Sequence, residues 1–241
     1  MLFDQNRVGI MQGRLLPRDL EKLQLFPEKD WERELKIAQD LGFGCFELLY
    51  DKELRLKTVL DNPANIHKLG LRDGGTPEIV TTKSVCLDFL ADVSMVKVAT
   101  RDQFIFSLQQ VIRSFAHTSV ETLVVPFCDN NLIDGDNEMA QIMRIFANSR
   151  FDQLAQSCDL QLALEIDLPP EMILKGFQPY DLKNIGICFD IGNITSTGRD
   201  ACADLSILNS LIRHVHIKDR PVGGPNVMLG DGDANFKACL E

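Results

Sequence analysis

Three short runs in the last third of the chain constrain the fold more than any other feature. In each of them apolar residues alternate with small or polar ones, and they span residues 160–166, 185–190 and 213–218. A period of two predicts a β-strand with bulky aliphatic side chains on one face and small or polar side chains on the other. The aliphatic faces suit packing against helices, and the opposite faces suit the crowded interior of a barrel.

At or near the end of the small or polar face of each run stands a residue that can bind a metal ion. These residues are Glu165, Asp190 and His216. In a parallel barrel the strand ends meet at one rim, where active sites are built, so we expect the three side chains to converge. Each also has a structural alternative: Glu165 as a loop acid paired with a lysine, Asp190 as the cap of the following turn, and His216 as a hydrogen-bonded core residue.

The rest of the chain continues the alternation of strands and helices. Earlier strands are predicted at residues 7–12, 45–50, 84–89 and 121–127, and helical patterns at 27–42, 52–70, 102–117 and 138–158, the last open to a break near Asn148 and Ser149. Such alternation predicts a parallel sheet with helical crossovers. We therefore expect residues 1–241 to form a single α/β domain, a TIM (β/α)₈-type barrel that lacks the eighth strand at its C-terminal end.

Composition narrows the classes of function. The formal net charge of −10 disfavours binding to nucleic acid or to an anionic membrane, since both need a basic face. The seven cysteines are scattered with no CxxC pair, which argues against a disulfide framework or a zinc ribbon and favours the reducing cytoplasm. No apolar run is long enough to span a bilayer. We expect a cytoplasmic protein with no nucleic-acid or membrane partner.

Five stretches give the chain a resemblance to a known family. They are VGIMQGR at 8–14, QLFP at 24–27, FDIGN at 189–193, HVHIKD at 214–219 and LGDG at 229–232. Together they resemble the xylose isomerase-like TIM-barrel superfamily, which includes sugar and sugar-phosphate isomerases and epimerases and is distantly related to endonuclease IV. The resemblance implies a divalent metal held by Glu, Asp, His and a second Glu on four successive strands. Glu165, Asp190 and His216 match the first three, and the second Glu belongs to the eighth strand.

The resemblance implies an isomerase or epimerase that acts on a sugar or sugar phosphate through an enediolate intermediate, with Glu165 as the catalytic base. A divalent cation stabilises the negative enediolate oxygen as a Lewis acid. Carboxylates with one imidazole suit Mn²⁺, Mg²⁺ or Co²⁺, and Zn²⁺ is also compatible. The expected partner is a small-molecule sugar or sugar phosphate.

Six further residues are candidates for contact with substrate: Gln12, Arg14, Glu47, Glu171, Asn193 and Lys218. Gln12 and Arg14 follow the first strand, and Glu47 lies on the inward face of the second. Glu171 has the spacing from Glu165 of a substrate-contacting Glu in the ketose 3-epimerase branch, and Asn193 stands where those epimerases carry a substrate-binding His. Structural roles stay open for Arg14, Glu47 and Lys218.

Two other functions remain open from the sequence. A catalytically degenerate barrel would bind a sugar or a protein, and we expect a homo-oligomer that covers the open edge between the first and seventh strands. Hydrolysis of phosphodiesters, as by endonuclease IV, needs three metals, more histidines and a basic groove. The four histidines and the net charge of −10 count against it.

Overall fold

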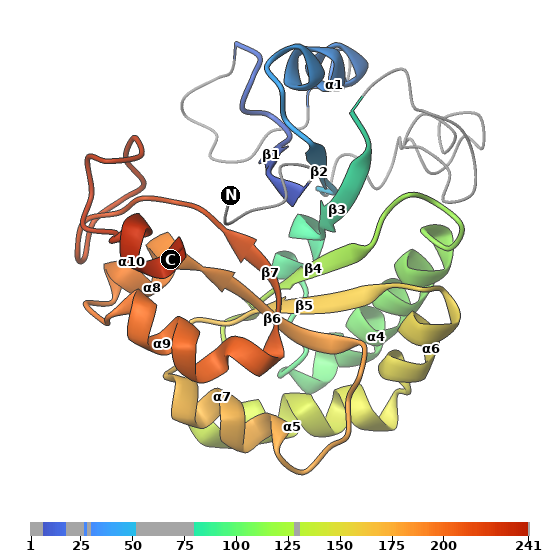
Figure 1. Ribbon diagram of the computed structural model, residues 1–241. Helices are drawn as coiled ribbons and strands as arrows, with labels where there is room; N and C mark the ends of the chain where they lie inside the picture. Colours follow the sequence, from blue (N-terminus) through green and yellow to red (C-terminus); the bar gives the residue numbers. More distant parts are fainter. Residues whose placement is uncertain (1–6, 18–26, 28–29, 52–79, 128–130, 241) are drawn as a thin grey trace.

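The computed structural model describes residues 7–17, 27, 30–51, 80–127 and 131–240. In these residues seven strands form one sheet in the order of the sequence, and every neighbouring pair is parallel (Figure 1). The strands are β1 (Gly9–Met11), β2 (Cys45–Leu49), β3 (Thr82–Cys86), β4 (Thr122–Pro126), β5 (Gln161–Glu165), β6 (Ile185–Asp190) and β7 (Ile212–His216).

The helices of the described residues cover the outside of the curled sheet (Figure 1). The α-helices are α1 (Trp31–Asp40), α4 (Val98–Ser114), α5 (Gly135–Asn148), α6 (Phe151–Ser157), α7 (Pro170–Phe177), α8 (Ile191–Ser196), α9 (Ala201–Leu208) and α10 (Phe236–Leu240). The 3₁₀ helices η3 (Asp88–Asp92) and η5 (Asn209–Leu211) also lie in the described part of the chain. None of the helices in the described residues has the length and apolar character that crossing a membrane requires.

The fold class predicted from the sequence is confirmed. The sheet is a barrel-type sheet of seven parallel strands, and within the described residues β1 and β7 are its two edges. The long helical pattern at 138–158 is divided into α5 and α6, because Arg150 adopts a left-handed conformation with φ of 56°. The helical pieces predicted at 52–70 lie outside the described residues.

The two faces of the strands differ as their alternation predicts. The aliphatic face of β5 and β6 packs in the large core against the helices, with Leu162, Leu164 and Ile187 almost fully buried. A smaller cluster fills the inside of the barrel and consists of Leu49, Cys86, Val124, Ala163 and Cys188, with Met11 packed against it. Since most of these inner side chains are small, space remains at the strand ends for polar side chains.

Two elements differ from the sequence prediction. Leu41, expected on the apolar stripe of the first helix, is 63% exposed, because α1 ends at Asp40 and the chain turns at Gly42 with φ of 84°. The third strand begins earlier than expected, and the residues after Cys86 form η3 instead of continuing the strand.

The loop after β1 is held by a buried acid of α1. Glu34 is 0% exposed, and its carboxylate accepts backbone N–H bonds from Gly13, Arg14 and Leu15, each at 2.8 Å. Three charge-assisted hydrogen bonds at one carboxylate fix the direction in which the chain leaves β1. This acid therefore positions the segment that carries Gln12 and Arg14.

Replacing Glu34 with Ala leaves three buried or partly buried N–H groups without their acceptor. We expect the free energy of unfolding to fall by about 1–3 kcal/mol, the cost of unsatisfied buried polar groups. The control is Asp40→Ala on the same helix, whose pair with Lys36 is exposed, so its effect stays within about 0.5 kcal/mol. Equal effects of the two variants in urea denaturation would contradict the anchoring role.

Candidate metal centre

The three predicted ligands meet around one side of the His216 ring. Nδ1 of His216 lies 3.8 Å from Oε1 of Glu165 and 3.7 Å from Oδ2 of Asp190. The register pairs Asp190 of β6 directly with His216 of β7, and both residues end their strands. The structure thus brings together two carboxylates and an imidazole at the C-terminal ends of three neighbouring strands.

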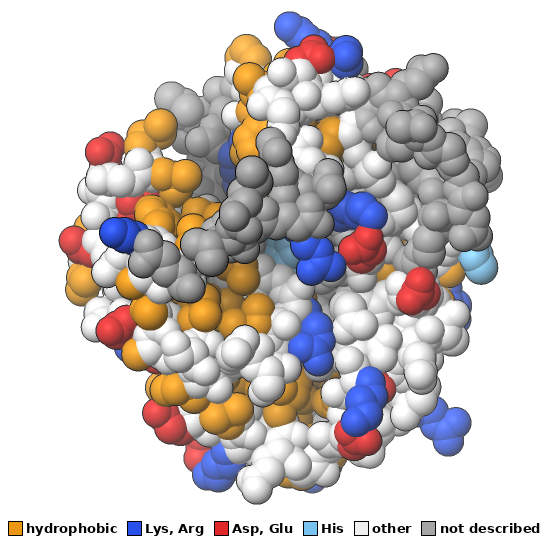
Figure 2. All heavy atoms as spheres, viewed as in Figure 1, with side chains coloured by type: hydrophobic (Ala, Val, Ile, Leu, Met, Phe, Trp, Pro, Cys, Tyr) orange, Lys and Arg blue, Asp and Glu red, His pale blue; other side chains and the backbone are white. Residues whose placement is uncertain are grey.

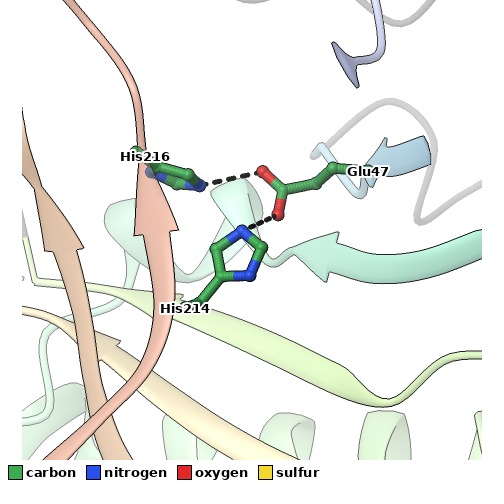
Figure 3. Close-up of side chains that lie close together, drawn as sticks. All are labelled: Glu47, His214 and His216. Atoms are coloured by element: carbon green, nitrogen blue, oxygen red, sulfur yellow. Dashed lines mark hydrogen bonds and ion pairs between the residues drawn. The ribbon is translucent and has the colours of Figure 1, made fainter. Parts of the chain in front are cut away.

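The other side of the ring is held by a carboxylate from the far side of the barrel (Figure 3). Nε2 of His216 lies 2.9 Å from Oε1 of Glu47, and Nε2 of His214 lies 2.8 Å from Oε2 of the same residue. The hydroxyl of Ser84 also donates to Oε2 of Glu47 at 2.7 Å. Because Glu47 lies on β2 and the histidines on β7, the contact crosses the interior of the barrel. We call Glu47, His214 and His216 the Glu47 clamp.

The clamp fixes which nitrogens carry protons. Burial by itself would raise the pKa of Glu47, but His216 and His214 hold it well below its usual range, so the carboxylate is ionised and can only accept. Both Nε2 atoms must therefore donate. When His216 loses its second proton, the lone pair is therefore on Nδ1, the nitrogen that faces Glu165 and Asp190.

The groups around His216 shift the pKa values of its ring and of Asp190. Burial would lower the pKa of His216, but the neighbouring Cys188, Glu47 and Asp190 raise it well above its usual range. Burial would raise the pKa of Asp190, yet His216 and Lys218 lower it to about 2. The cluster therefore favours positive charge next to its carboxylates, which is the environment that a cation-binding site provides.

Asp190 has both of the roles that the sequence left open. Its Oδ1 accepts the backbone N–H of Asn193 at 2.9 Å and so caps α8. Its Oδ2 faces His216 and lies 2.6 Å from Nζ of Lys218. Oδ1 thus stabilises the start of α8, and Oδ2 points toward His216 and Lys218.

Asn193 connects the cluster to two basic residues. Its Nδ2 donates to Oε1 of Glu165 at 3.3 Å, and its Oδ1 accepts from Nζ of Lys218 at 3.3 Å and from Nη1 of Arg220 at 3.2 Å. Burial would lower the pKa of Lys218, but Asp190 and Glu165 raise it. Asn193 and Lys218 therefore lie in the predicted site, where Asn193 orients Glu165.

The two candidates after β1 lie at the strand end. Gln12 is 0% exposed, and its Oε1 accepts the N–H of Leu49 at 3.2 Å. Its Nε2 is buried and has no hydrogen-bond partner among the described residues, so one donor remains available. The Nη2 atom of Arg14 lies 3.6 Å from Sδ of Met11, a residue that packs against the inner cluster.

Glu171 is not brought into the cluster by any contact among the described residues. It lies exposed in the first turn of α7, where it lines a surface hollow together with Leu174, Lys175 and Tyr180. Its role in substrate binding remains a prediction.

Three residues of the cluster were not among the sequence candidates. His214 shares Glu47 with His216, and Cys188 lies close to Glu165 and His216. Burial, together with Glu165 and Asp190, raises the pKa of Asp167 to about 6. The sequence does contain a signal for two of them. Cys188 stands two residues before Asp190, and Asp167 stands two residues after Glu165. Residues two apart lie on the same face of an extended chain.

The loop after β7 is organised by Asp219. Its carboxylate is 1% exposed and accepts backbone N–H bonds from Gly230 at 2.7 Å, Gly232 at 3.0 Å and Ala234 at 3.2 Å. A Cβ atom on Gly232 would lie 2.2 Å from Oδ1 of Asp219, so this position requires glycine. The N–H groups of the LGDG turn therefore bind a carboxylate of the chain itself.

The residues of the cluster fit a divalent cation. Two groups of three residues each have donor atoms that all lie within 4.8 Å of one another. The first group is Glu165, Cys188 and His216, and the second is Glu47, His214 and His216. Carboxylate and imidazole donors are those that Mn²⁺, Co²⁺ and Zn²⁺ accept. The nearby Asp190 adds a further oxygen to the first group.

Residues 35–241 match the family described as xylose isomerase-like TIM barrel, and the chain belongs to this family. A curated relative, an uncharacterized protein of Methanocaldococcus jannaschii, is 29% identical over 104 residues, which are 39% of this chain and 36% of that protein. The chain thus matches only about a third of this relative's length.

Solved structures share the fold at low sequence identity. L-ribulose 3-epimerase has a TM-score of 0.71 and 17% identity, with 96% of this chain and 75% of that chain covered. The IOLI protein with a bound zinc atom has a TM-score of 0.69 and 14% identity, with 97% of this chain and 84% of that chain covered. A xylose isomerase-like TIM-barrel protein from Mycobacterium smegmatis in complex with magnesium has a TM-score of 0.67 and 13% identity. Here too 97% of this chain and 84% of that chain are covered. These similarities concern the fold; the IOLI structure holds zinc and the Mycobacterium smegmatis structure holds magnesium.

The Asp219 contacts generate a prediction about pH. Burial would raise the pKa of Asp219, but the N–H groups of Gly232, Gly230 and Ala234 lower it. A lowered pKa means that the ionised carboxylate stabilises the fold above its unfolded pKa of about 4, and that this stability is lost as the pH falls through the folded value. We expect Asp219→Asn to lower the free energy of unfolding at pH 7, with a smaller difference from the wild type near pH 3.

The measurement is urea denaturation of both proteins at the two pH values. The control is Asp231→Asn, an exposed acid of the same loop, for which we expect little change at either pH. If Asp219→Asn lowers the free energy of unfolding by the same amount at both pH values, the ionised carboxylate of Asp219 is not the source of the stability.

Proposed function

We propose that the chain is a divalent-metal-dependent isomerase or epimerase of a sugar or sugar phosphate. The observation that carries this proposal is the convergence of Glu165 and Asp190 on Nδ1 of His216. It is supported by the structural neighbours, which include L-ribulose 3-epimerase and proteins that contain zinc or magnesium.

Glu165, Asp190 and His216 would hold the cation. When bound, it would supply Lewis acidity to the carbonyl and hydroxyl oxygens of the sugar. Glu165 would take the proton from the carbon next to the carbonyl, a role for which a carboxylate at the strand end is suited. The hydrogen bond from Nδ2 of Asn193 to Oε1 fixes the orientation of Glu165.

Glu47 would act through His216 rather than on the sugar. Both of its oxygens are engaged by His214, His216 and Ser84, which favours the structural role left open by the sequence. A carboxylate that accepts the second N–H of a metal-binding histidine fixes the ring orientation and makes the ligating nitrogen more basic. Glu47 is thus a positioning residue.

Three polar side chains at the strand ends would bind the substrate. The buried Nε2 of Gln12 has no partner among the described residues and suits a sugar hydroxyl. Lys218, with 35% of its side chain exposed beside Asp190, suits a hydroxyl or a phosphate oxygen. Arg14 at the end of β1 would bind a phosphate, for which a guanidinium is well shaped.

The surface at the edge strand suits the expected homo-oligomer. Figure 2 shows hydrophobic side chains gathered over the region of β7, α9 and α10, and Ile217 just after β7 is 49% exposed. We propose that residues 1–241 act as one domain in the cytoplasm, with this edge covered by another copy. A degenerate barrel that binds a sugar without turnover is the second candidate, since β1 and β7 are unpaired edges within the described strands.

The test is turnover of a panel of ketoses and ketose phosphates with Mn²⁺ or Co²⁺ in D₂O. We expect deuterium to appear at the carbon next to the carbonyl, and Glu165→Gln to lower the rate about 10²–10⁴-fold, because the variant loses the base. The control is Glu121→Gln, which changes an exposed acid just before β4.

The two candidates give different results. Unchanged turnover in Glu165→Gln would remove Glu165 from the mechanism. Saturable sugar binding to the wild type with no deuterium exchange across the panel would favour the degenerate barrel.

A further inference from the structure

We propose that the thiol of Cys188 is an additional ligand of this centre and that it makes the site select Zn²⁺ or Co²⁺ over Mg²⁺ and Mn²⁺. The inference rests on the proposed function only in requiring that the cluster binds a divalent cation. It concerns a residue that the family's Glu, Asp and His ligands do not include.

The strand register places Cys188 between other members of the cluster. It lies two residues before Asp190 on β6, and therefore on the same inward face of the strand. It pairs with Glu165 of β5 on one side and with His214 of β7 on the other. The sulfur and the donor atoms of Glu165 and His216 all lie within 4.8 Å of one another.

Cys188 is shielded from solvent, and its thiol contacts the ring of His216. It is 1% exposed and is a free cysteine. Below it the inner cluster is apolar, with Val124 and Ala163 as neighbours. The polar groups within its reach are those at the strand ends, so a cation held by Glu165 and His216 would also meet this sulfur.

A sulfur donor changes which metal the site prefers. Thiolates favour Zn²⁺ and other soft or borderline ions, whereas Mg²⁺ and Mn²⁺ favour oxygen ligands. With Cys188 the chain offers four ligands: two carboxylates, one imidazole and one thiolate. A tetrahedral zinc site also has four ligands. Formation of the sulfur–metal bond breaks the S–H bond and releases its proton to the solvent.

The experiment is a cobalt titration of the full, metal-free chain, followed by absorption spectroscopy. We expect the wild type to show a near-ultraviolet thiolate-to-cobalt charge-transfer band that is absent from Cys188→Ser. The matched control is Cys86→Ser, which changes another buried thiol of the same inner cluster and keeps the band. Competition experiments should show that the preference for Zn²⁺ over Mg²⁺ falls about tenfold or more in Cys188→Ser.

Zinc-edge X-ray absorption of the zinc-loaded wild type provides a second test that does not depend on the folding of a variant. One sulfur in the coordination shell supports the proposal, and a shell of nitrogen and oxygen alone overturns it. Cobalt binding without the charge-transfer band also overturns it and leaves the proposed function intact. Failure to bind Co²⁺, Zn²⁺ or Mn²⁺ at all overturns both proposals.

Discussion

The contact between Glu47 and the two histidines of β7 is the interaction on which the site depends. Glu47 is 6% exposed, and His216 lies 169 residues further along the chain. The contact is possible only because the sheet curls far enough for β2 and β7 to face each other across the interior. It also directs Nδ1 of His216 toward Glu165 and Asp190, so the curvature of the sheet determines how the imidazole of His216 is oriented.

The space for this arrangement comes from the inward side chains of the middle strands. Ala163 on β5 and Cys188 on β6 are small, and together with Val124 they form the apolar floor below the polar residues. Bulkier inward residues would fill the volume that the imidazole of His216 and the carboxylate of Glu165 occupy. The alternation of residues along each strand thus produces both the core outside the sheet and the polar site within it.

Much of the fold and part of the site could be predicted from local patterns. Alternation in β5, β6 and β7 gave the strands and their inward faces, and the convergence of Glu165, Asp190 and His216 follows from parallel strands that end at one rim. Contacts that depend on the curl of the sheet could not be predicted in this way, and the clamp at His214 is the clearest case. The same holds for Glu34, because nothing local indicates that a helical acid binds the backbone of another loop.

Local spacing was also an incomplete guide where the chain turns. The separation of Glu171 from Glu165 predicts a further substrate contact; Glu171 lies on the surface in the first turn of α7, and its contact with substrate stays a prediction. The LGDG turn has the composition of an anion site, yet its N–H groups are bonded to Asp219. In both cases the partner is decided by tertiary structure.

In the mechanism we propose, a cation binds on the Nδ1 side of His216 while Glu47 keeps the Nε2 side. Anomalous scattering from crystals soaked in Zn²⁺ measures this directly. We expect a peak within about 2.0–2.3 Å of Nδ1 and of ligand atoms from its neighbours on β5 and β6. A peak on the Nε2 side, among Glu47, His214 and His216, or the absence of any peak at the strand ends, would contradict it.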